Sequence, residues 1–214
     1  MELVFIHGWG FDARFWDAVS ARLRQFPQQR VDLGFFGRAS EPVHAPAVLV
    51  GHSLGFLHGL PQRNWAGWIA INSFPRFVQT PGQEGCVPPA MLREMRMRLS
   101  ANPAQTLQDF HAMIGSPMPE GMPNAECLRE GLDALRDGAV DENTACNIPG
   151  LVLASRKDPL VPVAASEKLG RMAQQGLWHE AGGHILPQSD PDWCAQAIEN
   201  FVASFFPAQE RKTA

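Results

Sequence analysis

Short apolar runs alternate along this chain with segments whose apolar residues recur at a helical spacing. The apolar runs predict six strands, in residues 3–6, 30–34, 47–51, 66–73, 150–158 and 176–181. Residues 47–51 are apolar at every position, which is typical of a strand buried on both faces. The helical spacing is clearest in residues 12–26 and 191–206. Strands that alternate with helices predict a mostly parallel sheet flanked by helices, an α/β fold.

Residues 74–146 break this alternation because they contain no strand-like run. They are rich in proline and methionine and have helical patterns at 89–100 and 103–114. We therefore expect a sheet core formed by residues 1–73 and 147–214, with a small helical lid inserted at 74–146.

Composition and charge narrow the function classes. The chain has 214 residues, enough for one well-packed core, and a formal net charge of −4, which argues against general affinity for nucleic acid or membranes. The first apolar run is too short for a signal peptide or a membrane span. The four cysteines form no CxxC pair, and two glycines interrupt the only zinc-like histidine pattern, at 179–184. We expect a cytoplasmic monomer that needs no metal or organic cofactor.

A candidate nucleophile lies in the sequence Gly51-His52-Ser53-Leu54-Gly55. This is a G-x-S-x-G motif between an apolar strand and a helical pattern. A serine hydroxyl attacks esters only when a base takes its proton and when a sharp turn exposes it above the sheet. The alternative interpretation is a serine in an ordinary tight turn.

Two further residues complete a possible triad in the chain order serine, acid, histidine. Asp158 follows the apolar run at 150–158, and His184 follows Gly182-Gly183 in the loop before the last helix. Taken singly, Asp158 is also compatible with a turn and His184 with a surface loop. Their order along the chain favours a Ser53-His184-Asp158 triad.

The loop at His7-Gly8-Trp9-Gly10 permits two interpretations. G-x-G-x-x-A at 8–13, with Asp32 about twenty residues on, resembles the loop that binds a dinucleotide's pyrophosphate. The same loop is also suited to an oxyanion hole, with N–H donors from Trp9 and from Leu54, the residue after the nucleophile. The triad pattern favours the oxyanion hole, with His7 bracing the loop.

These motifs resemble those of the α/β-hydrolase family: HGWG (7–10), VDLGFFGRAS (31–40), GHSLG (51–55), SRKDPLVP (155–162) and GGHILP (182–187). Within it the chain is most similar to the pimeloyl-[acyl-carrier protein] methyl ester esterases of biotin synthesis, which share HGWG and the pattern SPMPE…LREGLDALRDGAVD. The resemblance implies hydrolysis of a methyl ester at the far end of a dicarboxylic acyl chain held by acyl-carrier protein. It also places residue 3 at the family's third strand, so the first hairpin of the fold is expected to be absent.

The lid supplies the candidate substrate contacts. Apolar side chains there and at the motifs are expected to line an acyl channel, namely Trp9, Phe77, Met95, Phe110 and Leu160. The resemblance implies lid arginines that bind the acidic carrier protein, but Gln105 and Asp109 stand at two of those positions. Residues 109–142 hold eight acidic side chains against two arginines. Arg93, Arg96 and Arg98 are an alternative docking group, or simply a solvated helix face.

Three other functions remain compatible with the sequence. A general short-chain carboxylesterase or thioesterase shares every catalytic residue and differs only in its substrate. An NAD-binding oxidoreductase follows from the dinucleotide interpretation of the first loop. A non-catalytic binding protein with this fold is disfavoured because all three triad residues are present.

Overall fold

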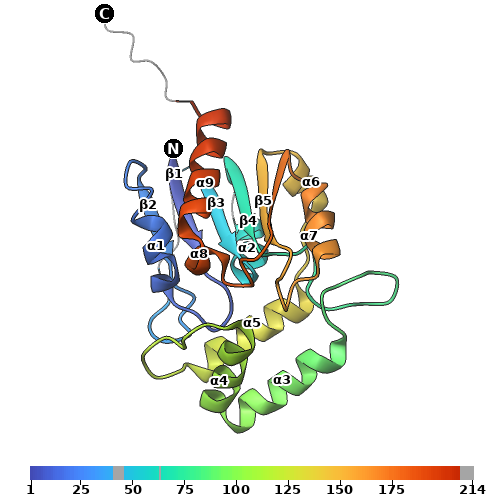
Figure 1. The fold of residues 1–214 in the computed structure, drawn as a ribbon. Helices are drawn as coiled ribbons and strands as arrows, with labels where there is room; N and C mark the ends of the chain where they lie inside the picture. Colours follow the sequence, from blue (N-terminus) through green and yellow to red (C-terminus); the bar gives the residue numbers. More distant parts are fainter. Residues whose placement is uncertain (41–45, 63, 208–214) are drawn as a thin grey trace, which may run out of the picture.

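The computed structural model describes residues 1–40, 46–62 and 64–207, and it is built around one six-stranded sheet (Figure 1). Its strands are all parallel and lie in the order β2-β1-β3-β4-β5-β6. They span Glu2–Ile6 (β1), Gln28–Val31 (β2), Ala47–His52 (β3), Gly67–Ile71 (β4), Gly150–Ser155 (β5) and Gln175–His179 (β6). The predicted parallel sheet is confirmed.

Helices cover both faces of this sheet. On one face lie η1 (Ala13–Trp16), α1 (Asp17–Ser20), α8 (Leu186–Ser189) and α9 (Pro191–Phe205), and on the other α2 (Leu54–Gly59), η2 (Leu60–Gln62), α6 (Glu142–Cys146) and α7 (Val163–Gly170). The side chains of β3, β4 and β5 are buried throughout because both faces are covered.

Three further helices lie together at one end of the sheet, at the bottom of Figure 1. They are α3 (Pro89–Ala101), α4 (Pro103–Ile114) and α5 (Ala125–Asp137). The side chain of Asn102 accepts a hydrogen bond from the N–H of Gln105, which caps α4 directly after α3 ends. This sharp turn packs the two helices against each other, and α5 packs on α3.

The expected helix at 12–26 is only partly present. The structure has η1 and the four-residue α1 instead, and the chain then turns into β2. The side-chain amide of Gln28 donates to the carbonyl oxygens of Ser20 (3.2 Å) and Leu23 (2.6 Å). These bonds satisfy carbonyls that a continuing helix would have used, so the helix ends early and β2 begins two residues before the expected strand.

Candidate active site

The G-x-S-x-G sequence forms a strained turn between β3 and α2. Ser53 has φ 52° and ψ −120°, a conformation that side-chain-bearing residues rarely adopt. A Cβ atom on Gly51 would meet the backbone of Phe56, and one on Gly55 would meet the carbonyl oxygen of Ile6. Only glycine fits at these two positions, so the motif lets the strand and helix approach closely enough to expose Ser53.

We therefore expect Gly55→Ala to destabilise the fold severely, by about 3 kcal/mol, because the added methyl group meets rigid backbone. Gly37→Ala is the matched control, since a Cβ atom there has no neighbour within 4 Å. Denaturant unfolding of both variants tests this. Equal stabilities would show that the α2 turn can relax away from β1.

Asp158 and His184 form a buried pair at the same end of the sheet. The Nδ1–H of His184 donates to Oδ2 of Asp158 at 2.8 Å, and the two side chains are 2% and 1% exposed. The N–H groups of Leu160 and Val161 donate to the other carboxylate oxygen of Asp158, at 2.8 and 3.0 Å. Because this leaves Nε2 of His184 without a proton in the neutral ring, that nitrogen is the one able to accept a proton from a nucleophile.

Ser53 is joined to this pair through its neighbour in the chain. The Nε2–H of His52 donates to the carbonyl oxygen of His184 at 2.9 Å, and the two rings are 4.8 Å apart. Burial and the nearby His184 hold the pKa of His52 well below its usual value, so His52 remains neutral. The structure thus bonds His184 to Asp158 directly and to the neighbour of Ser53, and all three predicted catalytic residues follow the carboxyl ends of parallel strands, β3, β5 and β6.

The first loop lies directly against Ser53, the candidate nucleophile. A Cβ atom on Gly8 would be 3.3 Å from the Cβ of Ser53, and Gly10 has φ 76°. His7 braces the loop: its Nδ1–H donates to the carbonyl oxygen of Gly8 (2.9 Å), and its Nε2 accepts the N–H of Leu33 (3.0 Å). The loop N–H of Trp9 and the N–H of Leu54 in the first turn of α2 are therefore the candidate oxyanion donors.

The dinucleotide interpretation of this loop does not fit the same geometry. The carboxylate of Asp32 accepts the N–H groups of Ala13 (3.1 Å) and Gly34 (2.8 Å), so it holds the loop rather than facing a ribose. Side-chain atoms of Leu107 and Phe110 would lie within 3.4 Å of a Cβ atom on Gly10, and they fill the space that a pyrophosphate would need.

The helices α4 and α5, which lie in the expected lid, are bonded to the first loop at two points. The indole Nε1–H of Trp9 donates to the carbonyl oxygen of Leu128 in α5 at 2.8 Å. The ring Nε2–H of His111 in α4 donates to the carbonyl oxygen of Gly10, also at 2.8 Å. Burial lowers the pKa of His111, which keeps its ring neutral. The helices α4 and α5 thereby fix the backbone that carries the candidate oxyanion donor.

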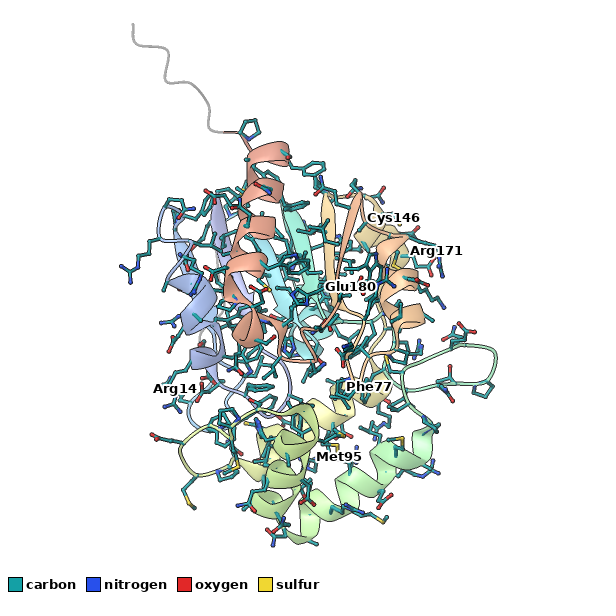
Figure 2. All side chains as sticks on the ribbon, viewed as in Figure 1. Arg14, Phe77, Met95, Cys146, Arg171 and Glu180 are labelled. Atoms are coloured by element: carbon teal, nitrogen blue, oxygen red, sulfur yellow. The ribbon has the colours of Figure 1, made fainter. Side chains whose placement is uncertain are left out.

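An apolar cavity of about 260 Å³ opens beside Ser53. All five side chains expected to line an acyl channel line this cavity, namely Trp9, Phe77, Met95, Phe110 and Leu160. Figure 2 shows Phe77 at the junction of core and lid, and Met95 within the lid. Met91 and Met113 also line the cavity and are about half exposed (54% and 50%), so they mark its mouth.

The three arginines of α3 do not form a single basic patch. Arg96 forms an ion pair with Asp133 of α5 and is only partly exposed. Arg98 lines the cavity, pairs with Glu94 at 2.5 Å and lies 4.0 Å from Asp109. Arg93 is exposed on the lid surface. Acidic neighbours therefore offset much of the positive charge that a docking surface would need.

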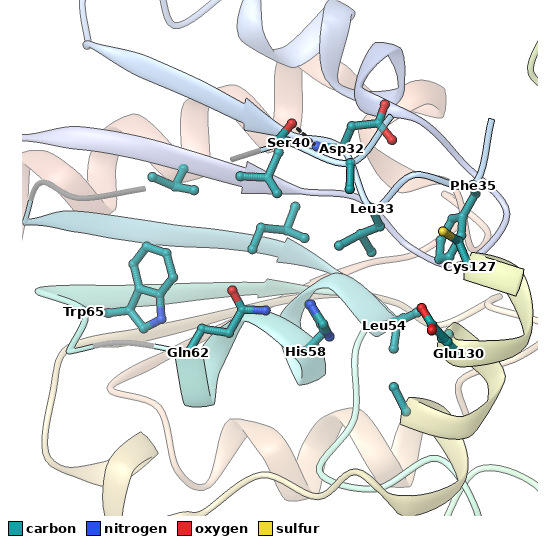
Figure 3. Close-up of a pocket in the computed structure, with 16 residues that line it drawn as sticks. Asp32, Leu33, Phe35, Ser40, Leu54, His58, Gln62, Trp65, Cys127 and Glu130 are labelled. Carbon is teal, nitrogen blue, oxygen red and sulfur yellow. Dashed lines mark hydrogen bonds between the residues drawn. The ribbon is translucent and has the colours of Figure 1, made fainter. Parts of the chain in front are cut away.

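A second cavity, of about 350 Å³, lies between β1, β2, α2 and α5 (Figure 3). Its lining includes Asp32, His58, Trp65 and Glu130, together with the side chain of Leu54. None of Ser53, Asp158 and His184 lines it, so this cavity is separate from the apolar cavity beside Ser53.

Sequence reasoning missed two polar residues at the end of β4. Asn72 and Ser73 are 1% and 0% exposed, and both bond to the backbone of the predicted triad residues. The available signal was weak: two polar residues directly follow the apolar strand at 67–71, which lies between the strands that lead to Ser53 and to Asp158.

Other site types find no support in the described residues. Within ranges 1–40, 46–62 and 64–207, no group of three or more His, Cys, Asp or Glu side chains could hold a metal ion. Among the described helices, none is long and apolar enough to cross a membrane. The four cysteines are free thiols.

Comparison with known proteins identifies relatives over most of the chain. This chain is 30% identical to the pimeloyl-[acyl-carrier protein] methyl ester esterase of Klebsiella pneumoniae (strain 342), over 75% of its own length and 77% of that protein. It is 26% identical to the Vibrio cholerae enzyme of the same name, over 92% and 93%. It is 28% identical to the biotin biosynthesis bifunctional protein BioHC of Cellvibrio japonicus, over 98% of this chain, and spans about half (49%) of that protein's length. No family model matches.

Solved structures show the same fold. An esterase from Exiguobacterium antarcticum superposes with a TM-score of 0.78 at 16% identity, and a bromoperoxidase from Bacillus anthracis with 0.79 at 15%. Each match covers 94% of this chain and 91% of the other. The predicted α/β-hydrolase fold is confirmed.

Proposed function

Because this chain belongs to the family of the pimeloyl-[acyl-carrier protein] methyl ester esterases, we propose that it hydrolyses the methyl ester of a pimeloyl chain carried by acyl-carrier protein. Its relatives and its fold make it a carboxylic ester hydrolase. The observation that carries the finer proposal is the apolar cavity that begins at Ser53 and ends at exposed methionines, since it suits a methylene chain with its carrier outside.

The geometry supports the following chemistry. Ser53 Oγ attacks the ester carbonyl while Nε2 of His184 takes its proton, and Asp158 stabilises the imidazolium that forms. The N–H groups of Trp9 and Leu54 stabilise the oxyanion, and one such donor contributes roughly 3–4 kcal/mol in related chemistry. His184 then protonates the departing methanol. Water, activated by the same histidine, releases the pimeloyl carboxylate and restores Ser53.

A second candidate function is general short-chain ester hydrolysis without a carrier protein. It is favoured by the acidic side chains at the cavity, because Glu94 and Asp109 neutralise Arg98 where a negatively charged carrier would approach. The two candidates share the catalytic residues and differ only in what the lid surface recognises.

Steady-state kinetics with matched substrates separates the two. We expect kcat/KM for pimeloyl-[acyl-carrier protein] methyl ester to exceed that for the same acyl group on pantetheine alone by about tenfold or more, because only the protein carrier contacts the lid. Equal kcat/KM values, together with fast hydrolysis of a short aryl ester, would support the general esterase instead.

Charge reversal on α3 tests the docking surface. Arg93→Glu should raise KM for the carrier-bound ester by about fivefold at low salt and leave the pantetheine ester unchanged, because Arg93 is exposed and does not line the cavity. Arg96 is left intact because it holds α3 to α5 through Asp133. The complementary Glu94→Gln, Asp109→Asn variant should lower the same KM. Unchanged KM values in both variants would place the carrier protein elsewhere.

A further inference from the structure

The end of β4 bonds to the backbone of all three elements that carry the candidate triad. On the nucleophile side, the N–H of Ser53 donates to the carbonyl oxygen of Ile71 (3.0 Å), and the hydroxyl of Ser73 donates to the carbonyl oxygen of Ser53 (2.9 Å). Between Ile71 and Ser73 lies Asn72, whose side chain bonds to the loop that carries His184 and to the end of β5.

The amide of Asn72 makes three hydrogen bonds. Its Nδ2 donates to the carbonyl oxygens of Gly183 (2.8 Å) and His184 (2.7 Å), and its Oδ1 accepts the N–H of Ser155 at the end of β5 (2.8 Å). One side chain therefore joins the loop of the general base to the strand that leads to Asp158. Two of these bonds run to backbone carbonyl oxygens of the His184 loop, so they fix the position of the His184 backbone. They do not touch the reacting nitrogen of the His184 ring.

Asparagine suits position 72 both in backbone conformation and in hydrogen bonding. Asn72 has φ 44°, a left-handed conformation in which asparagine is among the most tolerated residues after glycine. It is 1% exposed, so its donors and acceptor have no access to bulk water. A buried amide with all its hydrogen bonds made holds the segments around it in a single arrangement. Removing the amide takes one donor from each of the carbonyl oxygens of Gly183 and His184.

We propose that Asn72 is a positioning residue for catalysis. It holds the backbone of His184 in the position from which the imidazole ring reaches both Ser53 and Asp158. His52 supports the same carbonyl from the other side, through its bond to the oxygen of His184 at 2.9 Å. This inference rests on the Ser53-His184-Asp158 site of the proposed function.

Two variants test the role. Asn72→Gly keeps the positive φ and removes the amide, and Asn72→Asp keeps the shape and the bond from Ser155 but replaces the donor by an oxygen. We expect kcat for a short aryl ester to fall by about tenfold or more, with KM nearly unchanged, because substrate contacts are intact. The low-field proton resonance of the bond between His184 and Asp158 should weaken or broaden.

The control is Ile69→Val, which removes one methyl group from a fully buried core side chain in the same strand and leaves the three bonds of Asn72 in place. It should lower Tm without changing kcat or the resonance. If the Asn72 variants behave like Ile69→Val, with lower Tm but normal kcat and an intact resonance, the positioning role is overturned. Labelling of the unaltered protein by a fluorophosphonate separates the proposed function from the role of Asn72. If the unaltered protein is not labelled, the proposed catalytic site is wrong, whatever the Asn72 variants show.

Discussion

Ser53→Ala should abolish ester hydrolysis while leaving the fold intact. We expect kcat to fall by about a million-fold, equivalent to roughly 8 kcal/mol of lost transition-state stabilisation, because no other group can form the acyl-enzyme. Residual activity over water would come from the oxyanion donors and substrate binding alone. The measurement is kcat for an aryl ester and for the carrier-bound methyl ester with the same protein preparation.

Ser100→Ala provides the matched control, since Ser100 is exposed on α3 and its hydroxyl donates to a carbonyl oxygen of the same helix, that of Arg96. It should keep full activity. If Ser53→Ala retained more than about one hundredth of kcat, Ser53 would not be the nucleophile. The strained turn would then need a different explanation.

Asp158→Asn should lower kcat by about ten-thousand-fold with little loss of stability. The asparagine oxygen can still accept the N–H groups of Leu160 and Val161, so the loop keeps its shape. Its amide nitrogen cannot accept the proton on Nδ1 of His184, and the ring turns to the tautomer that carries hydrogen on Nε2. That nitrogen then has no lone pair for the proton of Ser53.

Asp190→Asn is the matched control for this change. Asp190 also accepts from a histidine, His179 at 3.2 Å, but lies at the start of α9 outside the cavity, and asparagine caps a helix as well as aspartate does. Its kcat should be unchanged. A fall of less than tenfold in Asp158→Asn would mean that Asp158 only shapes its loop.

The candidate site could be predicted where the chemistry depends on local sequence. The elbow follows from two glycines around Ser53, because their contacts are with the adjoining strand and helix. Asp158 and His184 follow from their positions after strands of a parallel sheet, whose carboxyl ends meet at one edge. The fold class could be predicted for the same reason, since strand and helix periodicities are local.

Features that depend on packing between distant segments could not be predicted. Arg96 forms an ion pair with Asp133 because α5 packs beside α3, and no local pattern in the sequence indicates that these two helices pack together. The shortened helix at α1 depends on a side chain eight residues away, since Gln28 takes the carbonyl oxygen of Ser20. Asn72 was missed because its partners lie 83 and 112 residues along the chain.

Active-site titration shows whether Ser53 performs covalent catalysis in this cavity. The protein is incubated with a fluorophosphonate, and intact mass and remaining esterase activity are followed together. We predict that one phosphonyl group per chain attaches at Ser53 and that activity falls in proportion, with no attachment in Ser53→Ala. Full activity after complete labelling, or labelling at another residue, would mean that Ser53 is not the nucleophile.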